Sequence, residues 1–370
     1  MQQRRGGRCD VSRRNVLAAG AGLSTVGTAG CLGSRAEGDA TEPVAFASFF
    51  TLAEFARAVG GDELSVENPV EIGSHGHEWE PSADLLPSVV DADAFVHLDV
   101  EGFQPWVDDV ARRIDDDYEN VTLIDALDGI DLMPYDDHSH DHDDGHSHDH
   151  DDHSHDDDHS HDHSHDDDHS HDHSHDDDHS HDHGHSHGEY DAKFFTDPVL
   201  AQRGVRNVRD GLIAIDPENR ATYRRNAATY VERLEELHNE FSDRLADRER
   251  DVVVLAGHDS FGYLGARYDF EIHTPVGLSP DHEPTPDRLA EAVDLVESEG
   301  IDCVLWDYFD GPQAAELIAE EADGDVETMM VTPGESTTEQ WHDEGVGSYV
   351  SQLERISLPA FERALGAAGE

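Results

Sequence analysis

The sequence predicts an α/β protein made of two lobes, and three observations lead to this. Short apolar runs with strand character alternate with amphipathic helical segments on both sides of a central low-complexity tract. This alternation is typical of a mainly parallel sheet with helices on both faces. A periodic segment of roughly 30 residues, about 45 Å as a helix, separates the two series and fits a strut between lobes.

The first series begins with a strand in "VAFASFF" (44–50). The next segment, "TLAEFARAVGG" (51–61), places Leu52, Phe55 and Val59 on one helical face and ends in two glycines, which favour a helix terminus. Similar patterns predict a helix after Pro81-Ser82, a strand at 94–98, a helix at 103–114 and a strand at 121–127.

Two helices follow the tract, and the second series of strands and helices comes after them. A helix is expected at 197–215, and a longer one begins at Asp216-Pro217, with apolar residues at steps of three and four through Leu245. A strand is predicted in "DVVVLAG" (251–257), and Thr285-Pro286 has the pattern of a helix cap followed by a first-turn proline. We also expect strands at 302–306 and 326–331 and a mostly helical segment from 337 to 366.

These elements predict a division of the chain. We expect a signal at 1–31, a linker at 32–42, an N-terminal metal-binding lobe at 43–216 with a disordered His/Asp-rich loop at 136–188, a bridging helix at 217–248 and a C-terminal lobe at 249–370.

The N-terminus resembles a targeting segment. Arg13-Arg14 precede a short Gly/Ala-rich apolar run, as in twin-arginine signals for export of folded proteins. The residues "TAGC" (28–31) resemble a lipoprotein box, which would make Cys31 the lipidated mature N-terminus. The alternative is an uncleaved N-terminal anchor. In either case we expect the body on the outer face of the cytoplasmic membrane. Only Cys31 and Cys303 would remain after cleavage, so we expect no structural disulfide.

The charge is strongly negative. The formal net charge is −61, and the 20 aspartates of the tract leave about −41 on the rest of the chain, which has a single lysine, Lys193. Such a surface repels nucleic acid and anionic lipid, so we expect no nucleic-acid partner and membrane contact only through a lipid anchor. Screening by salt would make the charge tolerable, which indicates a salt-adapted organism (a halophile). General acidity for solubility is the alternative. We also expect a monomer.

The tract between Asp136 and Gly188 consists almost only of His, Asp, Ser and Gly and holds 21 of the 29 histidines. A chain of this composition cannot offset the entropy of ordering, so we predict disorder without metal. Its His-x-His spacing allows two or three imidazoles around Zn²⁺, Cu²⁺ or Ni²⁺. We interpret it as an accessory metal collector, the alternative being a solvated acidic spacer. Pairs that represent it are His138, His140, His159, His161, His169, His171, His179 and His181.

Two regions outside the tract carry histidines that are candidate metal ligands. The polar loop "GSHGHEWEP" (73–81) carries His75 and His77, and His258 comes just after the strand at 251–257. Neutral imidazole binds zinc or manganese, so one histidine from each lobe would place an ion between them. The other histidines are expected to be ordinary core or surface residues; they are His97, His238, His273, His282 and His342.

An enzyme is a weaker interpretation. Ser260 in "AGHDSFG" (256–262) stands between a strand and a helix, but the spacing between its flanking glycines is one residue too long for a nucleophile elbow. The sequence shows no convincing acid–base partner for it and no HExxH motif. We therefore expect no catalysis.

An ordered series of motifs runs from Val44 to about Gly366. The motifs are "FASFFTLAEFARAVGGD", "HEWEP", "DPVLA", "AIDPEN", "HDSFGYL", "SPDHEPTP" and "AAELIAEE". This series resembles the substrate-binding receptors of zinc and manganese ABC importers. The resemblance implies two α/β lobes bridged by one rigid long helix, with the ion between them, in an extracytoplasmic receptor that gives its ion to the permease, with Zn²⁺ favoured over Mn²⁺. Because the family includes adhesion-annotated members, a cell-surface metal buffer or adhesin that uses the tract without transport is the alternative.

The resemblance also assigns metal positions. His77 matches the first metal histidine, and His258 matches the histidine typical of zinc-type members. Two positions depart from the family pattern: Lys193 stands where a histidine precedes the Asp-Pro of "DPVLA", and Thr332 where an aspartate precedes a proline. A protonated lysine has no lone pair to give. Candidate substitutes for the missing ligands are His187, His185, His75 and Glu335.

Overall fold

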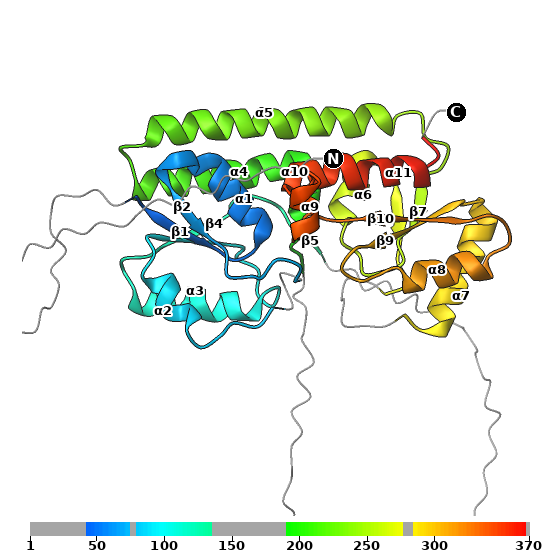
Figure 1. The fold of residues 1–370 in the computed structure, drawn as a ribbon, viewed down its shortest axis with the longest axis horizontal. Coiled ribbons are helices and arrows are strands. Elements are labelled where there is room, and N and C mark those ends of the chain that lie inside the picture. The colour runs from blue at the N-terminus through cyan, green and yellow to red at the C-terminus, as the bar shows by residue number, and fades with distance from the viewer. Residues whose placement is uncertain (1–41, 75–78, 135–189, 277–283, 368–370) are drawn as a thin grey trace, which may run out of the picture. The chain divides into compact units, whose positions relative to one another are not determined.

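The computed structural model describes residues 42–74, 79–134, 190–276 and 284–367 (Figure 1). Residues from Glu42 onward form one compact unit, which is described by itself. The predictions made for the signal, the His/Asp tract, His75, His77, His185, His187 and His282 fall outside the described residues.

The first sheet has four parallel strands in the order β2-β1-β3-β4. They span Ser65–Glu67 (β2), Val44–Ala47 (β1), Ala94–His97 (β3) and Thr122–Asp125 (β4). Side chains alternate between the two faces of the sheet. Ala45, Ala47, Ala94 and Val96 pack in the cluster that holds α1 (Phe50–Gly60) and α4 (Pro198–Ile215). Phe46 and Phe95 lie in the cluster formed with α2 (Leu85–Val90) and α3 (Pro105–Asp117).

The second sheet consists of two parallel pairs, β7 with β8 and β9 with β10, joined by a parallel bridge between Leu255 and Leu305. The strands span Val252–Val254 (β7), Glu271–His273 (β8), Cys303–Asp307 (β9) and Glu327–Val331 (β10). One face packs on α7 (Pro286–Glu299) and α8 (Gln313–Glu321). The other contributes to the cluster with Phe261, just before α6 (Gly262–Tyr268), and Phe361 of α11 (Leu358–Ala364). The predicted α/β class, with helices on both faces of parallel sheets, is confirmed.

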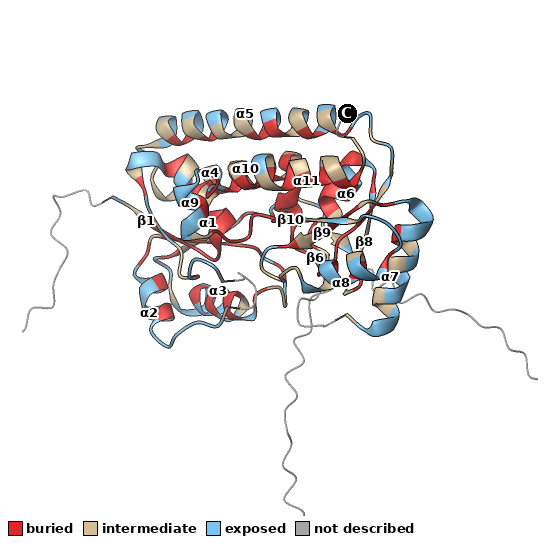
Figure 2. Cartoon of the chain, turned by 45° about the vertical axis from the view of Figure 1, so that its right-hand side comes forward, coloured by how far each residue is buried: buried red, intermediate tan, exposed pale blue. Residues whose placement is uncertain are grey.

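The long periodic helix is α5, Arg220–Arg244, and it is shorter than predicted. It begins after Asp216-Pro217 because the Asp216 carboxylate binds the residues of the turn. This carboxylate accepts hydrogen bonds from the Asn219 side chain at 2.8 Å and from the Tyr223 hydroxyl at 2.7 Å. Along α5 the buried residues lie on one side, as Figure 2 shows; they are Tyr223, Ala227, Leu234, Leu237 and Phe241.

The closing segment is mostly helical, as predicted. It contains α9 (Glu339–Asp343), α10 (Tyr349–Gln352), a π-helical turn at Leu353–Ser357 and α11. The predicted cap is also confirmed, since the Thr285 side chain accepts a hydrogen bond from the Arg288 amide at the start of α7. Single 3-10 turns occur at Gly61–Glu63 and Phe194–Thr196.

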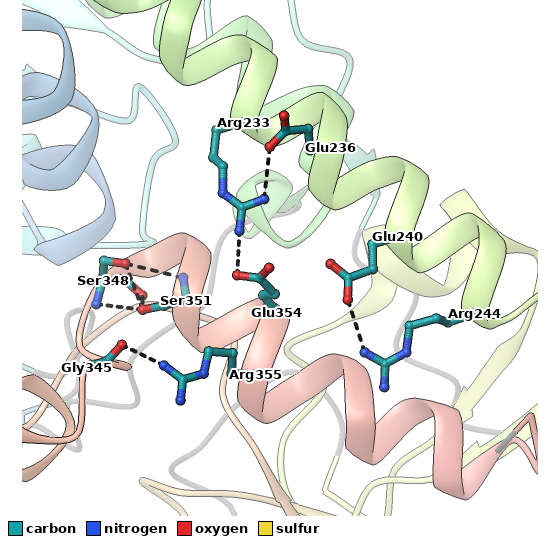
Figure 3. A network of polar contacts seen from close by, with 9 residues as sticks. All are labelled: Arg233, Glu236, Glu240, Arg244, Gly345, Ser348, Ser351, Glu354 and Arg355. Atoms are coloured by element: carbon teal, nitrogen blue, oxygen red, sulfur yellow. Dashed lines mark hydrogen bonds and ion pairs between the residues drawn. The ribbon is translucent and has the colours of Figure 1, made fainter.

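Two arginines of α5 connect this helix to the C-terminal helices (Figure 3). Arg233 pairs with Glu236 on its own helix and, at 2.5 Å, with Glu354 in the π-helical turn. Arg244 likewise pairs with Glu240 and with Glu362 of α11. The Arg233–Glu354 and Arg244–Glu362 pairs therefore join segments that are more than a hundred residues apart in sequence.

We expect the Arg233–Glu354 pair to stabilise the fold modestly and in a salt-dependent way. A double-mutant cycle with R233Q and E354Q, followed by urea unfolding, should give a coupling free energy of about 0.2–1 kcal/mol. That coupling should shrink at about 1 M salt, where charges are screened within about 3 Å.

The matched control is Arg112–Asp109 on α3, whose side chains are 64% and 65% exposed, against 36% and 28% for the Arg233 pair. The control cycle should give a smaller coupling, because solvent screens that pair more strongly. Equal couplings in the two cycles, or a coupling that ignores salt, would contradict this account.

Candidate metal-binding site

His258 lies at the edge of the second sheet where its strands end. β7 ends at Val254, and the chain continues beside β9, with the Ala256 amide donating to the Leu305 carbonyl at 2.7 Å. Neighbouring parallel strands have their carboxyl ends at the same edge, which is where open α/β sheets bind ligands. His258 therefore lies next to the loop that follows β9, and its side chain is fully buried.

Asp310, in that loop, holds His258 by two hydrogen bonds to one oxygen. Its Oδ2 accepts from the His258 backbone amide at 3.0 Å and from Nδ1 at 2.7 Å. Because a carboxylate only accepts, Nδ1 carries the proton, and in the neutral ring Nε2 is left with the lone pair. A carboxylate that holds the far nitrogen of an imidazole is typical of metal-binding histidines.

Gly257 makes this contact possible. A Cβ atom at position 257 would lie 2.4 Å from the Asp310 Oδ2 atom, closer than real side chains approach. The residue before the histidine must therefore lack a side chain if the carboxylate is to reach the His258 backbone.

Ser260 completes a chain of three side chains, and here one prediction was wrong. We expected no acid–base partner for Ser260, yet its Oγ lies 2.7 Å from the Nε2 atom of His258. The two residues are only two positions apart, so the loop folds the hydroxyl back onto the ring, an arrangement that strand–helix motif matching does not consider. A nucleophile must be reached by its substrate, however, and both Ser260 and His258 are fully buried.

The residues on either side of the His/Asp tract form a short antiparallel pair, β5 (Met133–Pro134) and β6 (Tyr190–Asp191). Tyr263 of α6 binds both strands, because its hydroxyl donates to the Asp191 carbonyl at 2.7 Å and accepts from the Met133 amide at 2.8 Å. The chain therefore leaves for the tract and returns from it beside the first turn of α6, a few residues after His258.

Asp191 is a candidate residue that sequence reasoning missed. It is buried, and burial raises the pKa of its carboxyl to about 6, while Lys193 lowers that pKa and Asp259 and Glu335 raise it further. Its Oδ1 accepts from the Lys193 amide at 2.8 Å. A Cβ atom at Gly262 would lie 3.5 Å from Asp191 Oδ2 and 3.8 Å from Asp259 Oδ2, so these carboxylates point toward the same place. The available signal was its position two residues before the unexpected lysine.

Lys193, the one lysine of the chain, is buried in this acidic surrounding. Its Nζ donates to the Asp259 carbonyl at 3.4 Å. The ammonium thus lies among carboxylates, at the sequence position where the resemblance expected a histidine.

Glu335 and Thr332 are both buried in the loop after β10. Thr332 has a structural role: its hydroxyl donates to Gln352 Oε1 at 3.1 Å and accepts from the Gly334 amide at 3.2 Å. Gln352 in turn donates to the Ser336 carbonyl at 3.0 Å. These bonds fix the backbone on both sides of Glu335, whose carboxylate interacts with Asp191.

Four of the histidines that we expected to be ordinary residues are described, and each has packing or hydrogen-bond contacts with neighbouring residues. His97 is buried and stacks on Phe95, and burial lowers its pKa, with Asp125 and Asp99 partly offsetting that effect. His238 contacts the Tyr268 hydroxyl at 3.1 Å, and His342 contacts the Thr337 hydroxyl at 3.4 Å. His273 ends β8, where its carbonyl accepts from the Leu255 amide.

The described ranges therefore contain part of the predicted ligand set. His258 and Glu335 are buried at the ends of β7 and β10, while His75, His77, His185 and His187 fall outside these ranges. Within 42–74, 79–134, 190–276 and 284–367, no three His, Cys, Asp or Glu side chains are grouped so as to hold a metal ion.

Parallel sheets flanked by helices and a buried histidine held by a carboxylate are compatible with a metal-binding receptor, and comparison with known proteins identifies the class. The family model described as "Zinc-uptake complex component A periplasmic" matches residues 46–357. The chain belongs to this family, called ZnuA, which is a family of metal-binding transport receptors and not of enzymes.

Individual relatives agree. The chain is 29% identical over 308 residues to the zinc-binding lipoprotein AdcA of Streptococcus pneumoniae, covering 83% of this chain and 53% of AdcA. It is 26% identical over 300 residues to the high-affinity zinc uptake system protein ZnuA of Bacillus subtilis, covering 81% of each. The chain thus spans about half the length of the streptococcal relatives it matches.

Solved structures give the same result. The Zn(II)-bound ZnuA-like domain of Streptococcus pneumoniae AdcA superposes with a TM-score of 0.65 at 26% identity, over 88% of this chain and 99% of that domain. The laminin-binding protein Lmb of Streptococcus agalactiae, described as having adhesin and metal-transporting activity, shares the fold with a TM-score of 0.65 at 20% identity, over 88% of this chain and 100% of Lmb.

Among the helices in the described part of the chain, none is both long and apolar enough to cross a membrane.

We expect G257A to disturb the site and G262A to leave it intact. An added methyl at 257 collides with the Asp310 carboxylate, whereas one at 262 meets its nearest neighbour at an ordinary 3.5 Å. Thermal or urea unfolding should show a loss of about 1–3 kcal/mol for G257A. G262A, at the start of a helix, should be neutral or slightly stabilised. Equal losses of stability in G257A and G262A would show that the Asp310 contact does not require a glycine at position 257.

Proposed function

We propose that this protein is an extracytoplasmic receptor that binds a zinc ion and delivers it to an ABC-type importer. The observation that carries the proposal is the Asp310–His258 pair: a buried imidazole at the end of a parallel strand, with Nδ1 held at 2.7 Å by a carboxylate. Because Nδ1 carries the proton, Nε2 carries the lone pair that can be donated to a Lewis acid. Zinc is a common Lewis acid for a neutral imidazole. Membership of the zinc-uptake family supports zinc as the ion, with manganese as the weaker candidate.

Carboxylates supply the remaining attraction for a cation in this proposal. Glu335 is one proposed ligand, and Asp191 takes the role of the histidine that is missing at Lys193. His77 is the proposed ligand from the loop at 73–81, with His75, His187 and His185 as the other candidates. Lys193 and Thr332 are not ligands: the lysine is a fixed positive charge beside the carboxylates, and the threonine supports the loop.

The tract is proposed to collect ions beside the site. The residues that flank it, in β5 and β6, are joined to α6 by Tyr263. The tract is therefore tethered to the chain near Asp191. This role is accessory, and the site itself is formed by the globular body.

The cellular setting follows from the N-terminal segment and the family. We propose export through the twin-arginine signal, lipidation at Cys31 and a monomeric receptor at the outer face of the cytoplasmic membrane, whose partner is a metal-importer permease. The division into lobes at 43–216 and 249–370, bridged by the helix within 217–248, and the salt-adapted surface belong to the same proposal.

Zinc titration of the mature protein lacking residues 138–187 tests the site. Calorimetry in high salt should show one tight zinc per chain, and H258A should abolish it because the oriented imidazole is lost. The matched control is H238A, since His238 contacts Tyr268 away from the candidate ligands and should be dispensable for zinc. If the shortened protein binds nothing while the intact chain binds several ions weakly, a site formed by the globular body alone is excluded. The metal-buffer function, or a site completed by His185 or His187 of the tract, then takes its place.

Substitutions around Lys193 test the proposed ligand exchange. K193H removes a positive charge and adds a lone pair, so zinc affinity should rise by about tenfold or more, while K193M should give a smaller rise through charge alone. D191N should weaken binding, because an amide is a poorer ligand than a carboxylate. The affinities can be measured by competition with a chromophoric chelator. A K193H variant that binds zinc no better than K193M would exclude this position from the coordination sphere.

A further inference from the structure

The Ser260 hydroxyl occupies the place where a metal ion must bind His258. The Oγ atom lies 2.7 Å from Nε2, and Asp310 holds the opposite nitrogen, so the ring has only this one lone pair to offer. A zinc ion bound by imidazole lies about 2.0–2.1 Å from the nitrogen, along the same lone pair. Hydroxyl and ion therefore exclude each other.

We infer that Ser260 is an internal competitor for zinc, a positioning residue whose hydroxyl holds the Nε2 lone pair of His258 in the metal-free protein and must rotate away before the ion binds. The inference rests on the proposed function, and it adds a control element to the same site. It assigns to Ser260 neither nucleophilic chemistry nor metal ligation.

Burial explains why a hydroxyl is needed at this place. His258 and Ser260 are both fully buried, and a buried acceptor without a hydrogen-bond partner costs free energy. One Asp310 oxygen accepts from both the ring Nδ1 and the backbone amide of His258, which fixes the orientation of the imidazole relative to its own backbone. The Ser260 hydroxyl is the hydrogen-bond partner of Nε2, the ring nitrogen that Asp310 does not contact.

The consequence is a site whose affinity is set by an exchange of partners. Zinc binding breaks the Ser260–His258 hydrogen bond, so the strength of that bond is subtracted from the affinity for the ion. A receptor that must also release its ion gains from such competition, because the returning hydroxyl stabilises the empty site.

The test is S260A in the full mature chain. Removing the hydroxyl should tighten zinc binding by about two- to tenfold, the equivalent of one ordinary hydrogen bond, and should speed association. Affinity is measured by competition between zinc and a chromophoric chelator, and association by stopped flow. The site is defined as the zinc-binding component absent from H258A, which separates it from ions held by the tract.

Two further variants make the result specific. S260T keeps a hydroxyl and should restore the wild-type affinity. S298A removes a serine hydroxyl on α7, where it donates to the Leu295 carbonyl at 3.2 Å, and should leave zinc affinity unchanged. In the metal-free protein, the ¹⁵N chemical shift of His258 Nε2 should change in S260A and stay unchanged in S298A.

The failures are distinguishable. If H258A binds zinc as the wild type does, the proposed function fails, and this inference fails with it. If H258A loses the site but S260A binds zinc with unchanged or weaker affinity, the receptor proposal stands and the competitor role is overturned. Tighter binding in S260A that S260T reverses supports the inference.

Discussion

The hold of Asp310 on His258 is the interaction on which the site depends. One carboxylate oxygen accepts from both the backbone amide and Nδ1 of His258, which fixes the position, orientation and tautomer of the ring. The contact requires β7 and β9 to run side by side with their carboxyl ends at one edge, and it requires a glycine at 257. The parallel topology of the second sheet thus brings Asp310 to His258, and this contact fixes the direction of the Nε2 lone pair.

Rigid support extends to the loop that carries Glu335. Hydrogen bonds among Thr332, Gln352 and the π-helical turn hold this loop in place. The Thr51 hydroxyl of α1 also donates to the Gly334 carbonyl at 2.5 Å. Gly334 has a φ of 87°, and a side chain there would meet the Tyr349 ring at 2.7 Å, so the turn is closely packed. Residues from both ends of the chain therefore position one carboxylate, although the sequence places them nearly three hundred residues apart.

Sequence patterns predicted the fold well because it follows from periodicity and caps. The alternation of Ala45, Phe46 and Ala47 between two cores, and the Thr285 cap of α7, are local features that a single sequence displays. The site was predicted less completely because its decisive contacts join loops. Asp310 belongs to none of the motifs in the sequence, and the bond from Ser260 back to His258 depends on side-chain directions within one turn. The motif that contains His258 therefore singled out this residue without showing its hydrogen-bond partners.

The single lysine is best understood through the charge of its surroundings. Burial raises the pKa of Asp191, and its interactions with Asp259 and Glu335 raise that pKa further. Lys193 lowers the pKa of Asp191, and its ammonium donates to the Asp259 carbonyl. The lysine thus offsets part of the negative charge that these carboxylates bring together. In the proposed function the same ammonium would oppose a bound cation, so one residue both stabilises the acidic cluster and limits its attraction for an ion.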